Sequence, residues 1–349
     1  MEHLTHTQAM RDAVLDGLHD IPFPSDDAER PAALLTRCPV AAPTPLVSAD
    51  ALATELGLTA LHIKDERDRM GLGSFKSLGA AYVIACDAQS GRAAGAAYYA
   101  ASAGNHGLSV AAGAKAFGAR AVIYLAQTVP AAFGARLEAL GAEVRWRGAI
   151  YEQSMAAAAE DAKAEGAIVL SDSSWPGYLE RPHRLMEGYL VLMHEAAAEM
   201  AEAPTHIFLQ AGVGGLACAC AAYARKVWGH APRIVVVEPD AAPALHASVA
   251  AGRSVVAPGP ASAMGRLDCK EPSLIALKGL ARDADDFVLI SEAEGQSGAD
   301  TAARIAMPST PSGAAGLAGL LAARVGGPAG DLGLDGGSRV LVILSEGPE

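Results

Sequence analysis

Short apolar runs alternate with alanine-rich segments along most of the chain, and this alternation constrains the fold more than any other feature. Eight candidate segments of four or five residues, most of them apolar, lie between turns that contain glycine. Continuous apolar runs of this length are typical of strands buried on both faces of a parallel sheet. We therefore predict strands over residues 60–63, 96–99, 121–125, 143–146, 167–170, 206–209, 233–237 and 340–344.

The segments between these runs show the spacing of apolar residues expected of helices. Strands that alternate with helices predict an α/β class fold with open, mostly parallel sheets. The first 45 residues contain six prolines and predict an irregular arm laid over the surface. The predicted helices cover residues 75–87, 107–117, 132–140, 152–165, 184–200, 216–228 and 313–323.

Composition excludes several classes of protein. The chain has 349 residues, a net charge of −12 and no run of Lys or Arg, so we expect no nucleic-acid partner. No apolar run reaches the roughly 18 residues of a membrane span, and the polar N-terminus does not resemble a signal peptide. The five cysteines form no CxxC pair, so neither a disulfide framework nor a zinc site is expected. Together these features predict a cytoplasmic protein.

A glycine-rich segment, residues 210–217 with the sequence QAGVGGLA, follows one predicted strand and opens a predicted helix. Gly212, Val213, Gly214, Gly215 and Leu216 place main-chain N–H groups at a helix N-terminus, where a phosphate is favoured. The segment also fits the relaxed dinucleotide pattern GxGxxA, with Glu238 ending the next strand 21 residues after residue 217. The motif alone therefore leaves a nicotinamide-dependent oxidoreductase open.

A second segment of small and polar residues, 101–107 with the sequence ASAGNHG, lies between a predicted strand and a predicted helix. Ser102, Asn105, His106 and the main-chain N–H groups at the helix start would suit a carboxylate. The alternative interpretation is an ordinary helix cap formed by Ser102 or Asn105.

Lys76 is the lysine most suited to covalent chemistry. It follows a glycine-rich turn and starts a predicted helix, where the helix dipole disfavours a cation. We therefore expect a depressed pKa, and a neutral amine can form a Schiff base. An exposed surface lysine is the alternative. Lys64 lies in a charge cluster and is expected to be solvated or salt-bridged. Neither an HExxH metal motif nor a GxSxG nucleophile elbow occurs.

Taken together, these segments resemble the fold-type II pyridoxal-phosphate enzymes, the family of tryptophan synthase β-subunit and threonine dehydratase. Within the family the chain is most similar to 2,3-diaminopropionate ammonia-lyases. Eight segments occur in family order and span roughly residues 40 to 347. They are residues 63–66 with 75–79, 104–107, 172–178, 210–215, 237–240, 269–272, 312–317 and 345–347.

The resemblance implies pyridoxal 5'-phosphate as the cofactor and a role for each matching residue. Lys76 would attach the cofactor through a Schiff base, and Gly212 to Leu216 would hold its phosphate through main-chain N–H groups. Asn105 would contact the phenolic oxygen, and Ser345 would face the pyridine nitrogen. The substrate carboxylate would lie against Ser102, Asn105 and His106. Lys76 and Asp172 would be the catalytic residues.

The resemblance also implies the architecture and the reaction. Residues 1–74 and 185–349 would form a large cofactor-binding domain, and residues 75–184 a smaller mobile domain on the substrate side. The cofactor would lie in the cleft between them, and relatives are commonly homodimers. The reaction would be an α,β-elimination on a small amino-acid substrate, such as 2,3-diaminopropionate, giving a 2-oxo acid and ammonia. No metal ion is implied.

Three positions depart from the family pattern. Ala103 stands where an Asp associated with D-isomers is usual, whereas the Asp associated with L-isomers is retained as Asp172. We therefore expect a preference for L-amino acids. Pro176 and Pro311 stand where Glu is usual, which weakens the case for a substrate with a cationic β-amine. A dehydratase acting on serine, threonine or 3-hydroxyaspartate is the alternative, as is a non-catalytic protein that binds the cofactor or an amino acid. Arg181, His183 and Arg184 could serve a distal anion, although surface exposure is their simpler interpretation.

Overall fold

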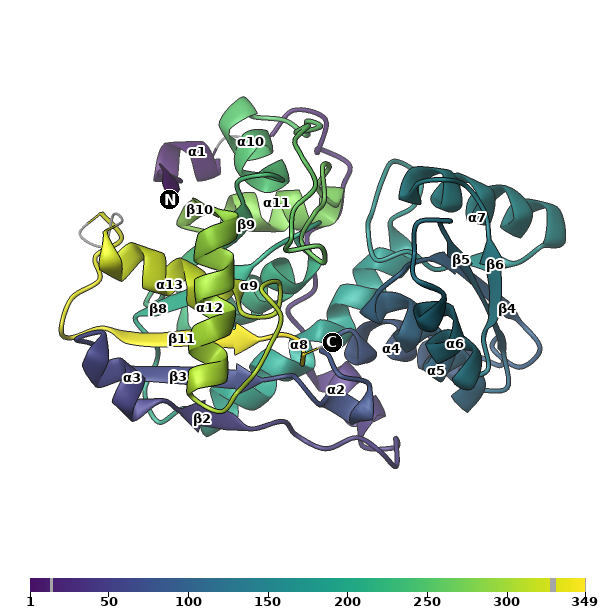
Figure 1. The fold of residues 1–349 in the computed structure, drawn as a ribbon, viewed down its shortest axis with the longest axis horizontal. Coiled ribbons are helices and arrows are strands. Elements are labelled where there is room, and N and C mark those ends of the chain that lie inside the picture. Colours follow the sequence, from purple (N-terminus) through teal and green to yellow (C-terminus); the bar gives the residue numbers. More distant parts are fainter. Residues whose placement is uncertain (13–14, 327–330, 349) are drawn as a thin grey trace.

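A computed structural model describes residues 1–12, 15–326 and 331–348 and contains two separate sheets, each with helices on its faces (Figure 1). One sheet has seven strands in the order β1-β10-β9-β8-β11-β3-β2, and the other has four in the order β6-β5-β4-β7. The prediction of an α/β fold with two mostly parallel sheets is confirmed.

The seven-stranded sheet has five parallel inner strands and two antiparallel edge strands, β1 and β2. Its inner strands are buried on both faces, because Ile207 and Leu209 of β8 contact one hydrophobic core and Phe208 contacts the other. This is the arrangement that continuous apolar runs predict. The strands are β1 (Glu2–Thr5), β2 (Leu46–Ser48), β3 (Ala60–Asp65), β8 (His206–Gln210), β9 (Arg233–Pro239), β10 (Asp286–Ile290) and β11 (Arg339–Leu344).

Helices cover both faces of this sheet. One core contains residues of α8, α9, α10 and α11, and the other contains residues of α3 and α13. The helices are α1 (Gln8–Asp12), α2 (Glu29–Leu35), α3 (Asp50–Glu55), α8 (Glu180–Glu199), α9 (Gly215–Trp228), α10 (Ala244–Ala251), α11 (Leu274–Asp283), α12 (Glu292–Arg304) and α13 (Ala315–Val325).

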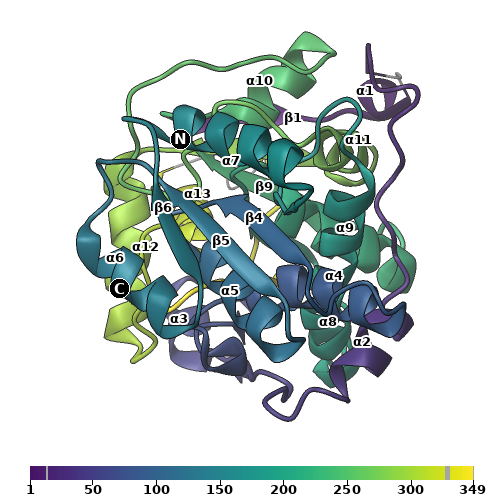
Figure 2. The same ribbon diagram turned by 90° about the vertical axis from the view of Figure 1, so that its right-hand side faces the viewer.

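The four-stranded sheet is entirely parallel and is seen from its own side in Figure 2. Its strands are β4 (Ala97–Ala101), β5 (Arg120–Leu125), β6 (Glu143–Trp146) and β7 (Ile168–Val169). Its helices are α4 (Ser77–Gln89), α5 (Asn105–Ala116), α6 (Ala131–Ala139) and α7 (Tyr151–Glu165). All eight predicted strands are therefore present, with ends that differ by up to two residues.

Helices α4 and α8 join the two sheets, because α8 packs against α4 on one side and against α9 on the other. The contact of α4 with α8 is very close: a Cβ atom on Gly188 would lie 2.2 Å from the carbonyl oxygen of Leu78. Only glycine fits at this crossing. The predicted domain boundary at residues 184 and 185 falls inside α8, and the division into two domains stays a prediction.

The N-terminal segment is more ordered than its prolines predicted. Residues Glu2–Thr5 form β1 and pair with β10, and Glu29–Leu35 form α2. Edge strands need only one hydrogen-bonded neighbour, so short segments without an apolar pattern can still form them. Among the described residues, no helix is both long and apolar enough to cross a membrane.

Candidate active site

The carboxyl ends of strands from both sheets meet at one region, as is usual for sites in open α/β folds. The segment that leads to Lys76 follows β3, the glycine-rich loop follows β8, and Ser345 follows β11. Ser102 follows β4 and Asp172 follows β7 in the other sheet. The segment before Lys76 is joined to the end of β11, because the Phe75 amide donates a hydrogen bond of 3.1 Å to the Ser345 carbonyl.

Lys76 and Asp172 form an ion pair although 96 residues separate them in the chain. Nζ of Lys76 donates to Oδ2 of Asp172 at 2.5 Å, and the two side chains are 22% and 21% exposed. The rings of Phe75 and Tyr189 flank the amine, with centroids 5.2 and 5.8 Å from Nζ. The two predicted catalytic residues, Lys76 after β3 and Asp172 after β7, are thus brought together beside two aromatic rings.

The expectation of a depressed Lys76 pKa is wrong for the protein without cofactor. Burial alone would lower the pKa of Lys76, but the negative charge of Asp172 raises it above its ordinary value. Burial alone would likewise raise the pKa of Asp172, but the charge of Lys76 holds it well below its usual range. The helix dipole at residue 76 is therefore outweighed by a carboxylate that local sequence could not place there.

The glycine-rich loop is built to leave amide groups open to an anion. Gly214 is the N-cap of α9, with φ of +97°, and no side chain caps that helix end. A Cβ on Gly214 would lie 3.0 Å from side-chain atoms of Ala276 and Leu245, and one on Gly212 would lie 3.0 Å from Sγ of Cys269. Side chains are thus excluded at both glycines, which leaves the main chain of a buried helix N-terminus to bind a phosphate.

The segment from Ser102 to His106 leads from β4 into α5 and includes three of the predicted site residues. Oγ of Ser102 accepts a hydrogen bond of 3.3 Å from the Gly104 amide. The His106 ring is buried, and its Nε2 donates to the Leu170 carbonyl at 2.8 Å. Burial lowers the pKa of His106, so the ring is neutral at pH 7 and its role there is structural. Only its main chain stays available to a substrate carboxylate.

Asn105 has a charged partner that the sequence did not suggest. Its Nδ2 donates to the carboxylate of Glu346, which also accepts from the hydroxyl of Thr310. Glu346 is 5% exposed, and its Oε2 lies 3.8 Å from Nε of Arg266. A buried carboxylate therefore joins the start of α5 to the segments around residues 266 and 310.

Several further residues at the site were not predicted. Sγ of Cys269 lies beside Gly212, and burial, followed by the negative charge of Asp172, raises the pKa of this thiol to about 12. Tyr151, the first residue of α7, is 48% exposed and lies near Asp172 and Lys76, whose charges act on its pKa. Cys269 belongs to a segment that carried the family resemblance, but Tyr151 had no signal in the sequence.

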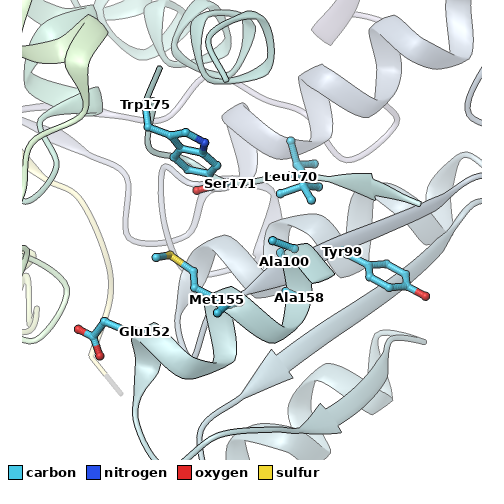
Figure 3. A pocket seen from close by; sticks show the side chains of 12 residues that line it. Tyr99, Ala100, Glu152, Met155, Ala158, Leu170, Ser171 and Trp175 are labelled. Atoms are coloured by element: carbon cyan, nitrogen blue, oxygen red, sulfur yellow. The ribbon is translucent and has the colours of Figure 1, made fainter. Parts of the chain in front are cut away.

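A cavity of about 330 Å³ lies beside this site in the four-stranded part of the molecule (Figure 3). Met155 of α7, Ala100 of β4 and Trp175 line it, together with Ser171, the neighbour of Asp172. None of the predicted site residues lines this cavity. Trp175 stacks on Tyr178 at 4.4 Å between ring centroids, which stabilises the loop that contains Pro176.

A family model described as pyridoxal-phosphate dependent enzyme matches residues 38–346. The chain belongs to this family. The match covers both anion loops, Lys76, Asp172 and Ser345, so pyridoxal phosphate is the cofactor of the family to which this site belongs.

Individual relatives agree with this assignment. Diaminopropionate ammonia-lyase of Salmonella typhimurium is 34% identical over 268 residues, which cover 69% of this chain and 66% of the relative. The Escherichia coli K12 enzyme of the same name is 32% identical over 267 residues, covering 70% and 67%. The chain therefore aligns with about two thirds of the length of these relatives. Human L-serine dehydratase/L-threonine deaminase is 29% identical over 245 residues, covering 69% and 70%.

A solved structure of the Escherichia coli ammonia-lyase, in complex with an aminoacrylate-PLP azomethine reaction intermediate, has a TM-score of 0.89. Its sequence is 28% identical, and the superposition covers 99% of this chain and 93% of that one. The likeness therefore extends over both sheets.

Glu238 argues against the nicotinamide alternative on structural grounds. Its carboxylate is fully buried and accepts hydrogen bonds of 2.7 Å from the amides of Leu245 and His246, near the start of α10. Both oxygens are thus used within the protein. The acidic residue that would contact a ribose in a dinucleotide site serves here to hold α10.

The distal residues Arg181, His183 and Arg184 lie at the start of α8 and are partly exposed. Nε2 of His183 donates to the Phe23 carbonyl at 3.1 Å. Arg184 pairs with Glu180 one helical turn away, at 3.4 Å. These contacts agree with the simpler interpretation as surface residues.

Proposed function

We propose that this chain is an ammonia-lyase that carries out α,β-elimination on a small β-substituted L-amino acid such as 2,3-diaminopropionate. The products are a 2-oxo acid and ammonia. The observation that carries the proposal is the Lys76–Asp172 pair, 2.5 Å apart, between a loop suited to a phosphate and a helix start suited to a carboxylate. Two relatives more than 30% identical are named diaminopropionate ammonia-lyases.

The residues present fit pyridoxal phosphate. Lys76 would hold its aldehyde carbon covalently, and the amides of residues 212–216 would bind its phosphate at the uncapped N-terminus of α9. Asn105 would bind its phenolic oxygen, and Ser345 would face its ring nitrogen. When bound, the cofactor supplies an electron sink for the electrons of the Cα–H bond.

The side chains of this chain would supply proton transfer and exclusion of water. The Asp172 carboxylate, or Nζ of Lys76 beside the rings of Phe75 and Tyr189, would take the proton from the substrate Cα. Asp172 would hold a proton near the β-substituent and give it to the leaving group. The short Lys76–Asp172 contact would allow the proton to move between them.

The α-carboxylate of the substrate would bind at the start of α5. Ser102, Asn105 and the main chain of His106 would be its ligands, assisted by the helix N-terminus. With Asp172 on one side of the site and Ala103 in place of a second carboxylate, we expect proton removal from L-amino acids and little from D-amino acids.

A dehydratase acting on serine, threonine or 3-hydroxyaspartate is the second candidate. Pro176 and Pro311 support it, because neither can neutralise a β-ammonium group. The human serine and threonine dehydratase relative supports it as well. We also propose that the chain forms a homodimer with the two domains set out above.

The test is the visible absorption spectrum of the purified protein with pyridoxal phosphate, before and after addition of L-2,3-diaminopropionate. We expect a cofactor band that changes on addition, together with formation of pyruvate and ammonia. A response to serine, threonine or 3-hydroxyaspartate alone would replace the first candidate by the second. A stable band with turnover of none of these amino acids would favour a non-catalytic binding protein.

A further inference from the structure

Tyr189 carries a buried hydroxyl group that has no partner in the described part of the chain. The residue lies in α8 and is 1% exposed, and its Oη atom makes no hydrogen bond to any described residue. Burial raises the pKa of Tyr189, so the phenol keeps its proton at neutral pH and can act as a donor. Such unpaired buried groups are rare in folded proteins, and a catalytic or binding role is one of the usual reasons for them.

The Tyr189 ring lies between two glycines that fix its position. A Cβ atom on Gly79 would lie 2.5 Å from Cε1 of the ring and 2.9 Å from Cζ, so only glycine fits beside that edge. On the other edge, a Cβ atom on Gly215 would lie 3.7 Å from Cε2. Rotation of the ring about its own axis does not move Oη. The hydroxyl therefore stays at one place between the two glycines.

Both glycines lie in the first turn of a helix. Gly79 is the third residue of α4, and Gly215 is the first residue of α9. Within the described residues no side chain caps either of these helix ends, and the positive end of a helix dipole favours an anion. Because Cε1 faces one helix start and Cε2 faces the other, the hydroxyl at the tip of the ring lies between two helix starts that favour negative charge.

The main-chain amides at the start of α4 are already used by the protein. Those of residues 77, 78 and 79 donate to the carbonyls of residues 74, 75 and 76 at 3.4, 2.9 and 3.0 Å. Oγ of Ser77 likewise donates to the carbonyls of Arg69 and Ser74. The hydroxyl of Tyr189 is thus a donor on this side that the described part of the chain leaves for an anion.

Lys76, which would hold the cofactor, lies beside the same ring, with Nζ 5.8 Å from the ring centroid. In pyridoxal phosphate the phosphate-bearing arm and the aldehyde are attached to neighbouring carbons of the pyridine ring. A cofactor with its aldehyde carbon at Lys76 and its phosphate at residues 212–216 must therefore bring the phosphate close to both Lys76 and Gly215. Tyr189 lies against both of these residues.

We propose that the hydroxyl of Tyr189 donates a hydrogen bond to the phosphate of pyridoxal phosphate. It would add a side-chain donor to the main-chain amides of residues 212–216, and the phosphate would be the partner of this buried hydroxyl. Hydrogen bonds to a charged phosphate are stronger than those between neutral groups. This role rests on the proposed function, which places the phosphate at residues 212–216, but it does not depend on which amino acid reacts.

The test compares Tyr189→Phe with Tyr223→Phe as the matched control. Both changes remove one phenolic hydroxyl and keep the ring. Tyr223 lies about 12 Å further along α9 than Gly215, and its hydroxyl is already bonded to Nδ1 of His194 at 2.7 Å. Each protein, prepared without cofactor, is titrated with pyridoxal 5'-phosphate and with pyridoxal, which lacks the phosphate. The cofactor band reports binding, and thermal unfolding with and without ligand is the second readout.

We expect Tyr189→Phe to weaken binding of pyridoxal phosphate roughly 10- to 100-fold, the range for a hydrogen bond to a charged group. Its affinity for pyridoxal is expected to equal that of the wild type. Without ligand, Tyr189→Phe is expected to unfold at the same or a higher temperature, because it removes a buried hydroxyl that has no protein partner. Tyr223→Phe is expected to lower the unfolding temperature and to leave both affinities unchanged.

Two results would overturn the role of Tyr189. One is an unchanged affinity of Tyr189→Phe for pyridoxal phosphate. The other is an equal loss of affinity for pyridoxal, which would mean that the hydroxyl serves the amine of Lys76 and not the phosphate. A wild type that binds pyridoxal phosphate no more tightly than pyridoxal would contradict the proposed phosphate site, and this role with it. A phosphate-dependent affinity that Tyr189→Phe leaves intact contradicts the role of Tyr189 alone.

Discussion

Two lysines that lie twelve residues apart are both paired with carboxylates, yet their surroundings differ in kind. Lys64 is fully buried and donates to Glu195 at 2.7 Å and to the Thr44 carbonyl at 2.6 Å. Lys76 is about one-fifth exposed and pairs with Asp172 between two aromatic rings. Lys64 therefore lies in a buried network of hydrogen bonds and ion pairs. Lys76 has one carboxylate partner and is partly accessible to solvent.

The network around Lys64 also includes Arg69. Its guanidinium donates to Glu66 and to Glu195 at 2.6 Å, and both Arg69 and Glu66 are fully buried. Burial acts against the charge of Arg69, but hydrogen bonds to the two glutamates raise its pKa above its ordinary value. Such a network fixes the path of the chain between β3 and Lys76. We therefore assign Lys64 and Arg69 a structural role. Lys76, whose one carboxylate partner is Asp172, is the lysine suited to a chemical role.

The most direct test of the difference between Lys64 and Lys76 is to remove each amine by substitution. We expect Lys76→Ala to lower turnover by about 10³- to 10⁴-fold, because in the proposed function this amine attaches the cofactor and takes part in proton transfer. Lys64→Met is expected to keep turnover within a few-fold and to lower thermal stability. The measurement is the rate of 2-oxo acid formation by each variant. Equal losses of turnover would show that the two lysines do not differ in role.

The second prediction concerns stability. Arg69→Met leaves the buried carboxylates of Glu66 and Glu195 without their main cation, so we expect the free energy of unfolding to fall by about 3–5 kcal/mol. Urea denaturation followed by circular dichroism measures this change. Arg304→Ala, which breaks an exposed pair with Glu55 at 2.9 Å, provides the control and is expected to cost less than about 1 kcal/mol. A similar small cost for Arg69→Met would contradict the structural role of the network.

The third prediction uses pH on the protein without cofactor. The lowered pKa of Asp172 stabilises the fold above the ordinary value of 3.8, and this contribution is lost as the pH falls toward its folded value. The raised pKa of Lys76 stabilises the fold below 10.5, and that contribution is lost as the pH rises toward its folded value. The pair therefore contributes most between about pH 4 and pH 10.

Asp172→Asn is expected to lower the free energy of unfolding by about 1.5–3 kcal/mol across this window. The difference from the wild type should shrink at both extremes of pH. Urea denaturation of both proteins at a series of pH values measures it. A difference that is the same at every pH would show that the ion pair does not stabilise the fold.

The smallest effect is expected at the aromatic rings beside Lys76. Phe75 and Tyr189 meet edge to face with centroids 4.8 Å apart. Phe75→Leu keeps an apolar residue but removes this contact, so we expect a loss of about 0.5–1.5 kcal/mol in unfolding free energy. Turnover should fall only a few-fold. A loss of turnover as large as that of Lys76→Ala would mean that the rings, rather than the carboxylate, control the amine.

Most inner strands and most long helices could be predicted, because their apolar residues form continuous runs in the strands and recur with helical spacing in the helices. The strand β10 was missed although its sequence DFVLI is apolar, and α12 was missed because it is polar and contains two glycines. A local signal for α12 was present nonetheless. Ser291 and Glu294 form a capping box, with each side chain bonded to the other residue's amide.

The glycine-rich loop could be predicted as the start of a helix, because its residues lie in one segment. The candidate site was not predictable where distant segments meet. Lys76 lies beside Asp172 and Asn105 beside Glu346 only because two sheets direct their strand ends to one place. Local sequence around Lys76 gave the wrong direction for its pKa, since the deciding charge is 96 residues away.

The central claim is that Lys76, and not Lys64, holds the cofactor. The most direct test is to load the protein with pyridoxal phosphate, reduce the covalent link with borohydride and locate the label by peptide mass spectrometry. We predict a label on Lys76 in the wild type and none in Lys76→Ala. A label on Lys64, or a label on another lysine that persists in Lys76→Ala at full turnover, would contradict the account.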